Sequence, residues 1–336
     1  MSTVAARATQ REEISGRFSG LLGAAIILAG GAVGYGLFPD DLLFLTSITA
    51  FALLVLSLDL VVGYAGIATL GQSVMFGAGA YAAGIACVRG LTEPLALLAI
   101  GAVAGALAGA LSGVVIARAH GLSQLVLSIA LVQLAREGAN KASFLTGGSD
   151  GLSGVAPGPV LGLFQFDIFG RTGFVLGILL LALVFAVLAR FVRSPFGLLC
   201  RGIKEDPARI EAMGRAPYPA LIKMYAVSGA IAGLGGALLA VSTGVVGLDS
   251  VSFDRSAEAL VMLVLGGIGT LWGALVGTVV FQIVEHIVSA ENPFHWLTLM
   301  GLLLIAVVLF LPGGLQASVG EVARLLRGRR PVGGKR

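Results

Sequence analysis

The chain is organised as a series of long apolar runs separated by short polar segments. At 1.5 Å per residue, about 20 helical residues cross the apolar core of a bilayer, about 30 Å thick, and most of the runs reach this length. The sequence therefore predicts about ten transmembrane helices, at 18–38, 42–62, 73–89, 94–117, 121–139, 172–191, 219–243, 256–268, 271–289 and 294–311. The run 256–268 is short and 63–72 is rich in glycine, so we expect broken or half-helices near 63–72 and 256–270.

The composition supports the same fold class. Hydrophobic residues make up 57% of the 336 residues and charged residues only 12%, which is about half the share typical of a soluble domain. The mean hydropathy is +0.97. The long runs also exclude a β-barrel, whose strands would be alternating segments of about ten residues. We therefore expect an all-α integral membrane protein.

Residues that could carry catalysis are few and scattered. The cysteines Cys87 and Cys200 and the three histidines lie far apart, and the sequence contains no HExxH, CxxC or GxxxxGK[ST] motif. We expect no enzyme activity, no catalytic residue, no metal site and no cofactor bound by the chain. Energy for uphill transport would have to come from an ion gradient or from another subunit.

Basic residues gather in four segments of the chain. Seventeen of the 22 Lys and Arg lie in 1–17, 118–120, 190–223 and the C-terminal tail. With ten crossings, all four segments face one side, which the positive-inside rule assigns to the cytoplasm, and both termini lie there. The net charge of +4 is then explained by contact with anionic lipid headgroups, so we expect a lipid bilayer and no nucleic acid as partner. The resulting division is a cytoplasmic tail at 1–17, a transmembrane domain at 18–312 with a cytoplasmic loop at 192–218 and a noncytoplasmic loop at 141–171, and a basic cytoplasmic tail at 313–336.

Residues 56–84 combine an acidic residue inside an apolar run, Asp59, with six glycines. Such a segment fits either tight helix packing or a backbone break that is buried in protein or lines a wet path. Asp59 fits either an interior position beside such a path or an acid near the membrane surface. A weaker echo of the glycine pattern at 260–278 is consistent with a duplicated unit. The residues expected at the path or at the helix breaks are Asp59, Gly63, Gly66, Gly71, Gln72, Gly266, Gly267 and Gly269.

The predicted cytoplasmic loop contains a short helix with an apolar surface. Asp206 is suited to cap this helix, Pro207 to its first position and Gly214 to its end. The helix carries more apolar residues than a solvated turn requires, namely Ala208, Ile210, Ala212 and Met213. It therefore fits insertion into a groove of a partner protein or, alternatively, a position flat on the bilayer surface.

The predicted noncytoplasmic loop contains TGGSDGLSGV at 146–155, which is rich in turn-forming residues. This segment fits a docking surface for a soluble partner or a plain connecting loop, and its composition favours the plain loop. If the segment docks a partner, the residues expected there are Gly148, Ser149 and Asp150.

Five segments together resemble one family of transport proteins. They are GYAGIATLGQSVMFGAGAY at 63–81, LTGGSDGLSGV at 145–155, SPFGLLCRGIKEDPARIEAMG at 194–214, VLGGIGTLWGALVG at 264–277 and LFLPGGL at 309–315. Over residues 42–316 the sequence resembles the permease subunits of the high-affinity branched-chain amino acid ABC transporters (the leucine/isoleucine/valine importer family), in particular the M-type subunit. The resemblance implies the ABC importer fold of the branched-chain amino acid and simple-sugar type, in a bacterial inner membrane.

The resemblance also implies a set of partners. A homologous second permease would complete the translocation path, two cytoplasmic ATPases would hold ATP and Mg²⁺, and a periplasmic or extracellular binding protein would deliver branched-chain or related small amino acids. Residues 203–214 would form the coupling helix, with Glu211, Ala212 and Gly214 matching the family's EAA-type motif. The residues expected at the ATPase are Ile203, Glu205, Ala208, Ile210, Glu211, Ala212, Met213 and Gly214.

Two departures from the family leave the solute open. The family commonly has Asn where this chain has Asp59, and His where it has Gln72. Importers of the same architecture also handle urea, short amides and other small polar solutes. An alternative from another class is a secondary transporter driven by an ion gradient, with Asp59 as the ion-linked carboxylate. Such a carrier would have no need for an ATPase-docking helix, so residues 203–214 favour the ABC importer. A membrane-embedded enzyme is disfavoured, because no paired His or carboxylate motif lies in any run.

Overall fold

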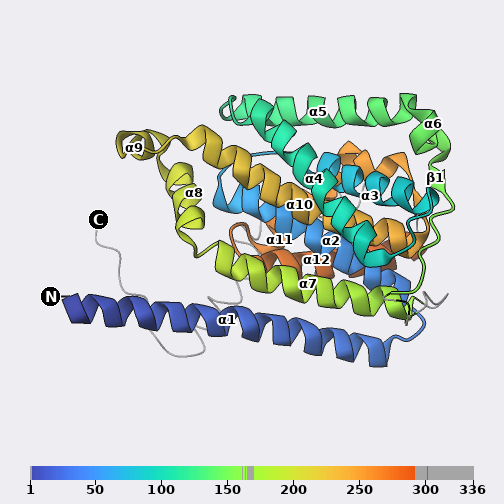
Figure 1. The fold of residues 1–336 in the computed structure, drawn as a ribbon, viewed down its shortest axis with the longest axis horizontal. Coiled ribbons are helices and arrows are strands. Elements are labelled where there is room, and N and C mark those ends of the chain that lie inside the picture. The colour runs from blue at the N-terminus through green and yellow to red at the C-terminus, as the bar shows by residue number, and fades with distance from the viewer. Residues whose placement is uncertain (1, 161, 163, 165–169, 292–300, 302–336) are drawn as a thin grey trace.

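The computed structural model describes residues 2–160, 162, 164, 170–291 and 301, and most of them are helical (Figure 1). The nine predicted runs that fall within the described residues all form helices. The tenth run, 294–311, the tail 313–336 and the motif 309–315 lie outside the described residues. The long helices are α1 (Ser2–Leu37), α2 (Leu42–Asp59), α3 (Gln72–Val88), α4 (Pro94–Ile116), α5 (Leu122–Lys141), α7 (Arg171–Phe191), α10 (Pro217–Thr243), α11 (Phe253–Gly266) and α12 (Leu271–Glu291).

Short elements connect these helices. The predicted tail 1–17 is continuous with the first helix, because α1 already begins at Ser2; its Ala, Arg, Gln and Glu residues are good helix formers. The remaining elements are the π-helical turn η1 (Leu60–Tyr64), α6 (Ser143–Thr146), the 3₁₀ turn η2 (Gly148–Asp150), β1 (Leu152–Ser153), α8 (Pro195–Glu205), α9 (Pro207–Ala212), β2 (Val245–Val246) and the 3₁₀ turn η3 (Leu248–Val251).

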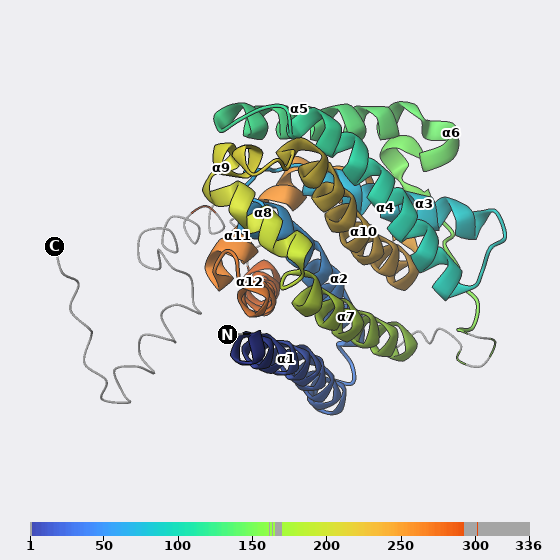
Figure 2. The same cartoon turned by 60° about the vertical axis from the view of Figure 1, so that its left-hand side comes forward.

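Helix α2 forms the centre of the bundle. Every residue from 48 to 61 is buried, so this helix is enclosed by protein on all sides. A helix that is apolar around its whole circumference and surrounded by other helices is a core element of a membrane domain. Helices α10, α7, α12 and α11 pack around it, and Figure 2 shows α5 and α1 on opposite sides of the bundle.

Glycines allow α3, α4 and α10 to pack with their backbones almost in contact. A Cβ atom added at Gly233 of α10 would lie 2.9 Å from the Cα of Gly105 in α4, and one added at Gly101 would lie 3.0 Å from the carbonyl oxygen of Gly233. These distances leave no room for a side chain. Small residues drive helix association in membranes because they permit such close approach.

Six of the described helical segments are long and apolar enough to cross a membrane: Gly20–Leu37, Leu42–Tyr64, Pro94–Ile116, Arg171–Phe191, Pro217–Thr243 and Leu271–Ser289. Helix α3 is a shorter apolar helix. Large apolar side chains are exposed along the outer faces of α4 and α7, including Leu107 and Leu183, as expected for lipid contact. The chain is a multi-pass, all-α membrane protein, and its total of ten crossings stays a prediction.

The connecting segments meet in two groups. In one group, β1 pairs antiparallel with β2, and Gly158 N donates to the carbonyl of Thr92 over 2.7 Å. In the other group, Arg118 Nε donates to the hydroxyl of Tyr218 over 3.1 Å. Each group contains only segments that the basic-residue pattern places on the same side of the membrane. Within the segment 141–171 the structure describes α6, η2 and β1, and β1 pairs with β2, which follows the end of α10.

Candidate functional site: the helix breaks and the α8–α9 element

The first helix break follows α2. The chain passes through the π-helical turn η1, in which Ala65 N donates to the carbonyl of Leu60 over 3.1 Å, and then runs irregularly until α3 begins at Gln72. Gly66 has a φ of 74°, a left-handed conformation that glycine adopts without strain. The predicted break near 63–72 is confirmed.

The second break separates α11 from α12. Helix α11 ends at Gly266, and Gly267 and Gly269 have φ values of 114° and 82° before α12 begins at Leu271. Thr270 Oγ1 donates to the carbonyl of Gly267 over 2.9 Å and closes this short turn. The predicted break near 256–270 is confirmed.

Asp59 connects the two breaks. Its side chain is fully buried in the bundle, away from lipid, and Oδ1 accepts a 2.6 Å hydrogen bond from the backbone N–H of Gly269. Among the described residues, Oδ2 has no hydrogen-bond partner. A Cβ atom added at Gly63 would lie 2.7 Å from the nitrogen of Gly269, so the two breaks touch backbone to backbone. The structure therefore brings together three of the residues predicted for the path or the breaks.

Gln72 belongs to a different polar cluster, where α2, α3 and α10 meet. Its Nε2 donates to Ser57 Oγ over 2.8 Å and to Ser228 Oγ over 2.6 Å, and Ser228 Oγ donates to the carbonyl of Ser57. Ser73 N donates to Ser256 Oγ nearby over 3.0 Å. All of these side chains are buried. Sequence reasoning missed the serines, although polar residues inside apolar runs were the available signal.

The predicted ATPase-coupling stretch 203–214 consists of two helices. Asp206 Oδ1 accepts from Arg209 N over 3.1 Å and caps α9, whose first residue is Pro207, as the sequence predicts. The same residue interrupts the stretch, since α8 ends at Glu205. A single helix over 203–214 is therefore a wrong expectation, because an N-cap residue takes an extended backbone conformation.

The end of α9 has the geometry of a Schellman motif. Gly214 has a φ of 80°, its N–H donates to the carbonyl of Glu211 over 2.9 Å, and Arg215 N donates to the carbonyl of Ile210 over 3.2 Å. This is the pair of hydrogen bonds by which a left-handed glycine terminates a helix. Gly214 thus occupies the terminating position that the sequence predicts.

The predicted coupling residues differ in exposure. Ile203 is buried in the protein's own core, so the prediction that it faces the ATPase is wrong. Its spacing from Gly197 and Cys200 on the buried face of α8 was the helical signal for this. Ile210 is half-buried and packs over Gly202. The exposed residues are Glu205, Ala208, Glu211, Ala212, Met213 and Gly214, and the side chain of Met213 is 73% exposed.

Two basic residues of α8 that sequence reasoning did not single out contact the first break. Lys204 Nζ donates to the carbonyl of Gly63 over 2.7 Å, and the Arg201 guanidinium lies 4.7 Å from the centroid of the Tyr64 ring. The first contact joins residues 141 positions apart in sequence. No local pattern in one sequence indicates such a pair.

The three residues considered for docking a soluble partner lie in the group of segments away from α8 and α9. Gly148 is buried with a φ of 60°, whereas Ser149 and Asp150 are exposed in η2. The adjoining β1–β2 pair holds this turn against the end of α10.

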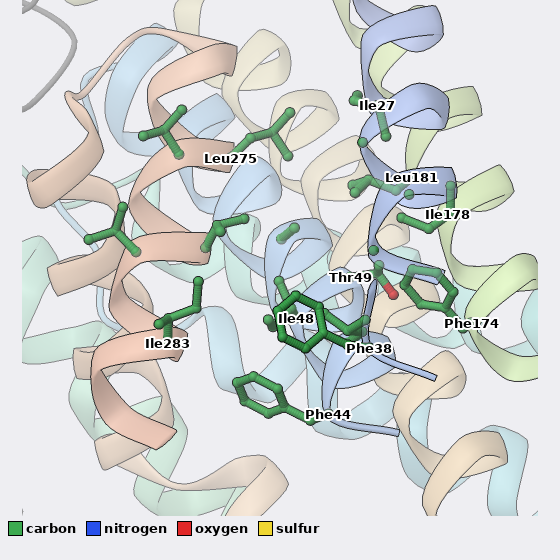
Figure 3. Close-up of a pocket in the computed structure, with 18 of the residues that line it drawn as sticks. Ile27, Phe38, Phe44, Ile48, Thr49, Phe174, Ile178, Leu181, Leu275 and Ile283 are labelled. Atoms are coloured by element: carbon green, nitrogen blue, oxygen red, sulfur yellow. The ribbon is translucent and has the colours of Figure 1, made fainter. Parts of the chain in front are cut away.

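A separate cleft of about 600 Å³ lies between α1, α2, α7 and α12 (Figure 3). Its lining is mostly apolar and includes Ile27, Phe38 and Leu181. None of the residues predicted for the path contributes to it. An apolar lining of this kind does not suit an amino acid, which carries two charged groups at neutral pH.

Comparison with known proteins gives a consistent assignment. The family model described as "Branched-chain amino acid transport system / permease component" matches residues 42–308. The permease protein LivM of the high-affinity branched-chain amino acid transport system of Escherichia coli K12 is 26% identical over 301 residues, covering 83% of this chain and 70% of LivM. LivH of the same system is 30% identical over 135 residues, covering 40% of this chain and 44% of LivH.

An archaeal protein shows a similar likeness over a shorter region. The probable branched-chain amino acid transport permease LivM of Methanocaldococcus jannaschii is 26% identical over 147 residues, covering 40% of this chain and 43% of that protein. No solved structure matches the chain significantly. The resemblance to the M-type permease is confirmed, and since the family model spans most of the sequence, the chain belongs to the permease component family of branched-chain amino acid transport systems.

Proposed function

We propose that this chain is the membrane-spanning subunit of an ATP-driven importer for branched-chain or related small amino acids. It forms the translocation path beside a homologous second permease, in keeping with its likeness to both LivM and LivH. Two ATPases bind ATP and Mg²⁺ on the cytoplasmic side, and a binding protein delivers the solute on the other side. The chain itself holds no nucleotide.

The exposed surface of α9 is the observation that carries this proposal. None of the residues of α9 is buried, although the helix has a complete cap at each end. Ala208, Ala212 and Met213 present apolar groups to the outside, next to Glu211. Burying a side chain the size of Met213 in a partner's groove contributes about 1.5–3 kcal/mol. A capped helix whose apolar side chains are exposed in the chain alone can gain this free energy by docking to another subunit.

The sidedness of the proposal follows from the same element. Helices α8 and α9 lie at the end of the bundle from which the N-terminal part of α1 projects (Figure 1). The basic segment 190–223 contains both, which supports a cytoplasmic position. Ser149 and Asp150 then lie on the opposite side, where a binding protein would dock.

Purification of the chain with its ATPases tests this proposal. Met213→Asp places a charge in the docking surface and is expected to remove the ATPases from the purified complex. Phe144→Asp is the matched control, because Phe144 is 86% exposed in α6, away from α8 and α9, and this variant should retain them. Hydrolysis of ATP by the parental complex should rise when the binding protein loaded with leucine is added. Retention of the ATPases by the Met213 variant would remove the main support for this function, and stimulation by urea instead of leucine would reassign the solute.

A further inference from the structure

Helix α8, which precedes the proposed docking helix α9, is hydrogen-bonded to the first helix break. Lys204 lies in the last turn of α8, and its ammonium group donates to the carbonyl of Gly63 in η1 over 2.7 Å. A Cβ atom added at Gly66 would lie 2.6 Å from Cγ of Lys204, so the stem of the lysine runs directly against the backbone of the break. Arg201, one turn earlier, stacks on Tyr64. Helix α8 therefore holds η1 through both of its basic side chains.

The first break is in turn hydrogen-bonded to the second. Asp59 immediately precedes η1, and its Oδ1 accepts from the N–H of Gly269 over 2.6 Å. Gly63 and Gly269 lie close enough that neither a side chain nor a water molecule separates their backbones. A single line of contacts thus runs from α9 through α8 and η1 to the turn between α11 and α12. We call Asp59, Gly63, Lys204 and Gly269 the connecting network.

The connecting network is held by two side chains that can carry charge, Lys204 and Asp59. Hydrogen bonds to charged groups are stronger and more directional than neutral ones. The network uses one from the Lys204 ammonium and one to the Asp59 carboxyl group, both with backbone groups outside the α-helices. It also leaves Oδ2 of Asp59 buried without a hydrogen-bond partner among the described residues. Elsewhere in this bundle a neutral side chain makes the hydrogen bond between helices, since Ser228 Oγ donates to the carbonyl of Ser57.

From these contacts we infer that Lys204 and Asp59 are positioning residues that carry movement of the docking helices to both helix breaks. This inference rests on the proposed function, because it assumes that an ATPase moves α9. When α8 is displaced, Lys204 displaces the carbonyl of Gly63, and Asp59 displaces Gly269 with it. The two breaks, at η1 and between α11 and α12, then shift together inside the bundle. Segments whose backbones lack regular helical bonds can change conformation at small cost, which suits them to such a switch.

Substitution of Lys204 in the complete complex tests this inference. Lys204→Met keeps the unbranched stem but removes the donor, and Lys204→Arg keeps both charge and donor. Lys223→Met is the matched control, because Lys223 is an exposed lysine of the same basic segment. Each complex is reconstituted in liposomes, and uptake of radiolabelled leucine, ATP hydrolysis and the amount of bound ATPase are measured.

The expected result is uncoupling. The Lys204→Met complex should retain its ATPases and its basal hydrolysis, lose at least tenfold in leucine uptake, and no longer respond to the loaded binding protein. Lys204→Arg should restore at least a third of the uptake, and Lys223→Met should match the parent. Leucine uptake by Lys204→Met within twofold of the parent would overturn the inference, and so would loss of its ATPases, which would make Lys204 a docking residue. Absence of ATPases from the parental complex would instead refute the proposed function.

Hydrogen exchange supplies a readout that a purely structural role would not change. In the parental complex, ATP binding should alter exchange in peptides covering 60–66 and 266–271 together. In Lys204→Met it should alter neither, while peptides from α9 still respond. Parallel changes in both peptides of the variant would contradict a connection through Lys204.

Discussion

The end of helix α9 offers a test in which backbone conformation alone is perturbed. Gly214 has a φ of 80°, and a Cβ atom added there would meet nothing within 4 Å. The Cβ atom of a valine would therefore lie in open space, but the substitution places a β-branched residue in a left-handed conformation. That conformation costs a non-glycine residue roughly 1–2 kcal/mol, and branched residues resist it most.

The six-residue helix α9 has no buried residues with which to resist this strain. The chain can relieve it by breaking the two hydrogen bonds that Gly214 and Arg215 donate, which unwinds the last turn and displaces Met213. If docking requires the intact turn, the cost appears as a loss of affinity of about 5- to 30-fold. Gly214→Asn is the control, because asparagine tolerates the left-handed region.

The assay is titration of the purified ATPase against the chain in nanodiscs. We expect Gly214→Val to bind about 5- to 30-fold more weakly than the parent and Gly214→Asn to bind within about twofold of it. Parental affinity of the valine variant would show that α9 does not need this ending to dock. An equal loss in the asparagine variant would show that the glycine acts by something other than its backbone conformation.

Three further predictions concern the membrane domain. Asp59→Asn should leave leucine uptake within about threefold of the parent, because the asparagine side-chain oxygen can still accept the backbone hydrogen bond, whereas Asp59→Leu should abolish uptake. If uptake and its pH dependence are unchanged in the asparagine variant, Asp59 is not the ion-linked carboxylate that a gradient-driven carrier would require. In a cysteine-free background, Asp150→Cys and Glu205→Cys should react with an impermeant thiol reagent from opposite sides of the membrane, and labelling from one side would contradict the topology. Gly233→Val should lower the free energy of unfolding by about 1–3 kcal/mol or more, because its Cβ would meet backbone atoms of α4, whereas Gly36→Val should be neutral, since nothing lies within 4 Å of its Cβ; equal denaturation midpoints would contradict the packing account.

Features of the chain that depend on local chemistry could be predicted from the sequence. The apolar runs predict helices because a bilayer requires internally bonded segments of a fixed length. Asp206, Pro207 and Gly214 define α9 because caps and left-handed glycines act within a few residues of where they stand. The glycines at 63–71 and 266–269 indicate the two breaks for the same reason.

Features of the chain that depend on tertiary contacts could not be predicted from the sequence. The partner of Asp59 is a backbone N–H of Gly269, which has no side-chain signature, and the partner of Lys204 is a carbonyl 141 residues away. For Ile203 the helical spacing from Gly197 and Cys200 indicates a shared face, but the core residues that bury this face come from distant parts of the chain. The two-residue pairing of β1 with β2 is too short to leave a pattern of alternating residues.

The energy source of uptake tests the central claim most directly. The complete complex is reconstituted in liposomes with its ATPases facing the ATP-containing compartment, and accumulation of radiolabelled leucine is followed with and without ionophores that collapse all ion gradients. If α9 couples this chain to ATP hydrolysis, leucine accumulates only with hydrolysable ATP and is unaffected by the ionophores. Accumulation that proceeds without ATP and stops when the gradients collapse would contradict the account and make the chain a secondary transporter.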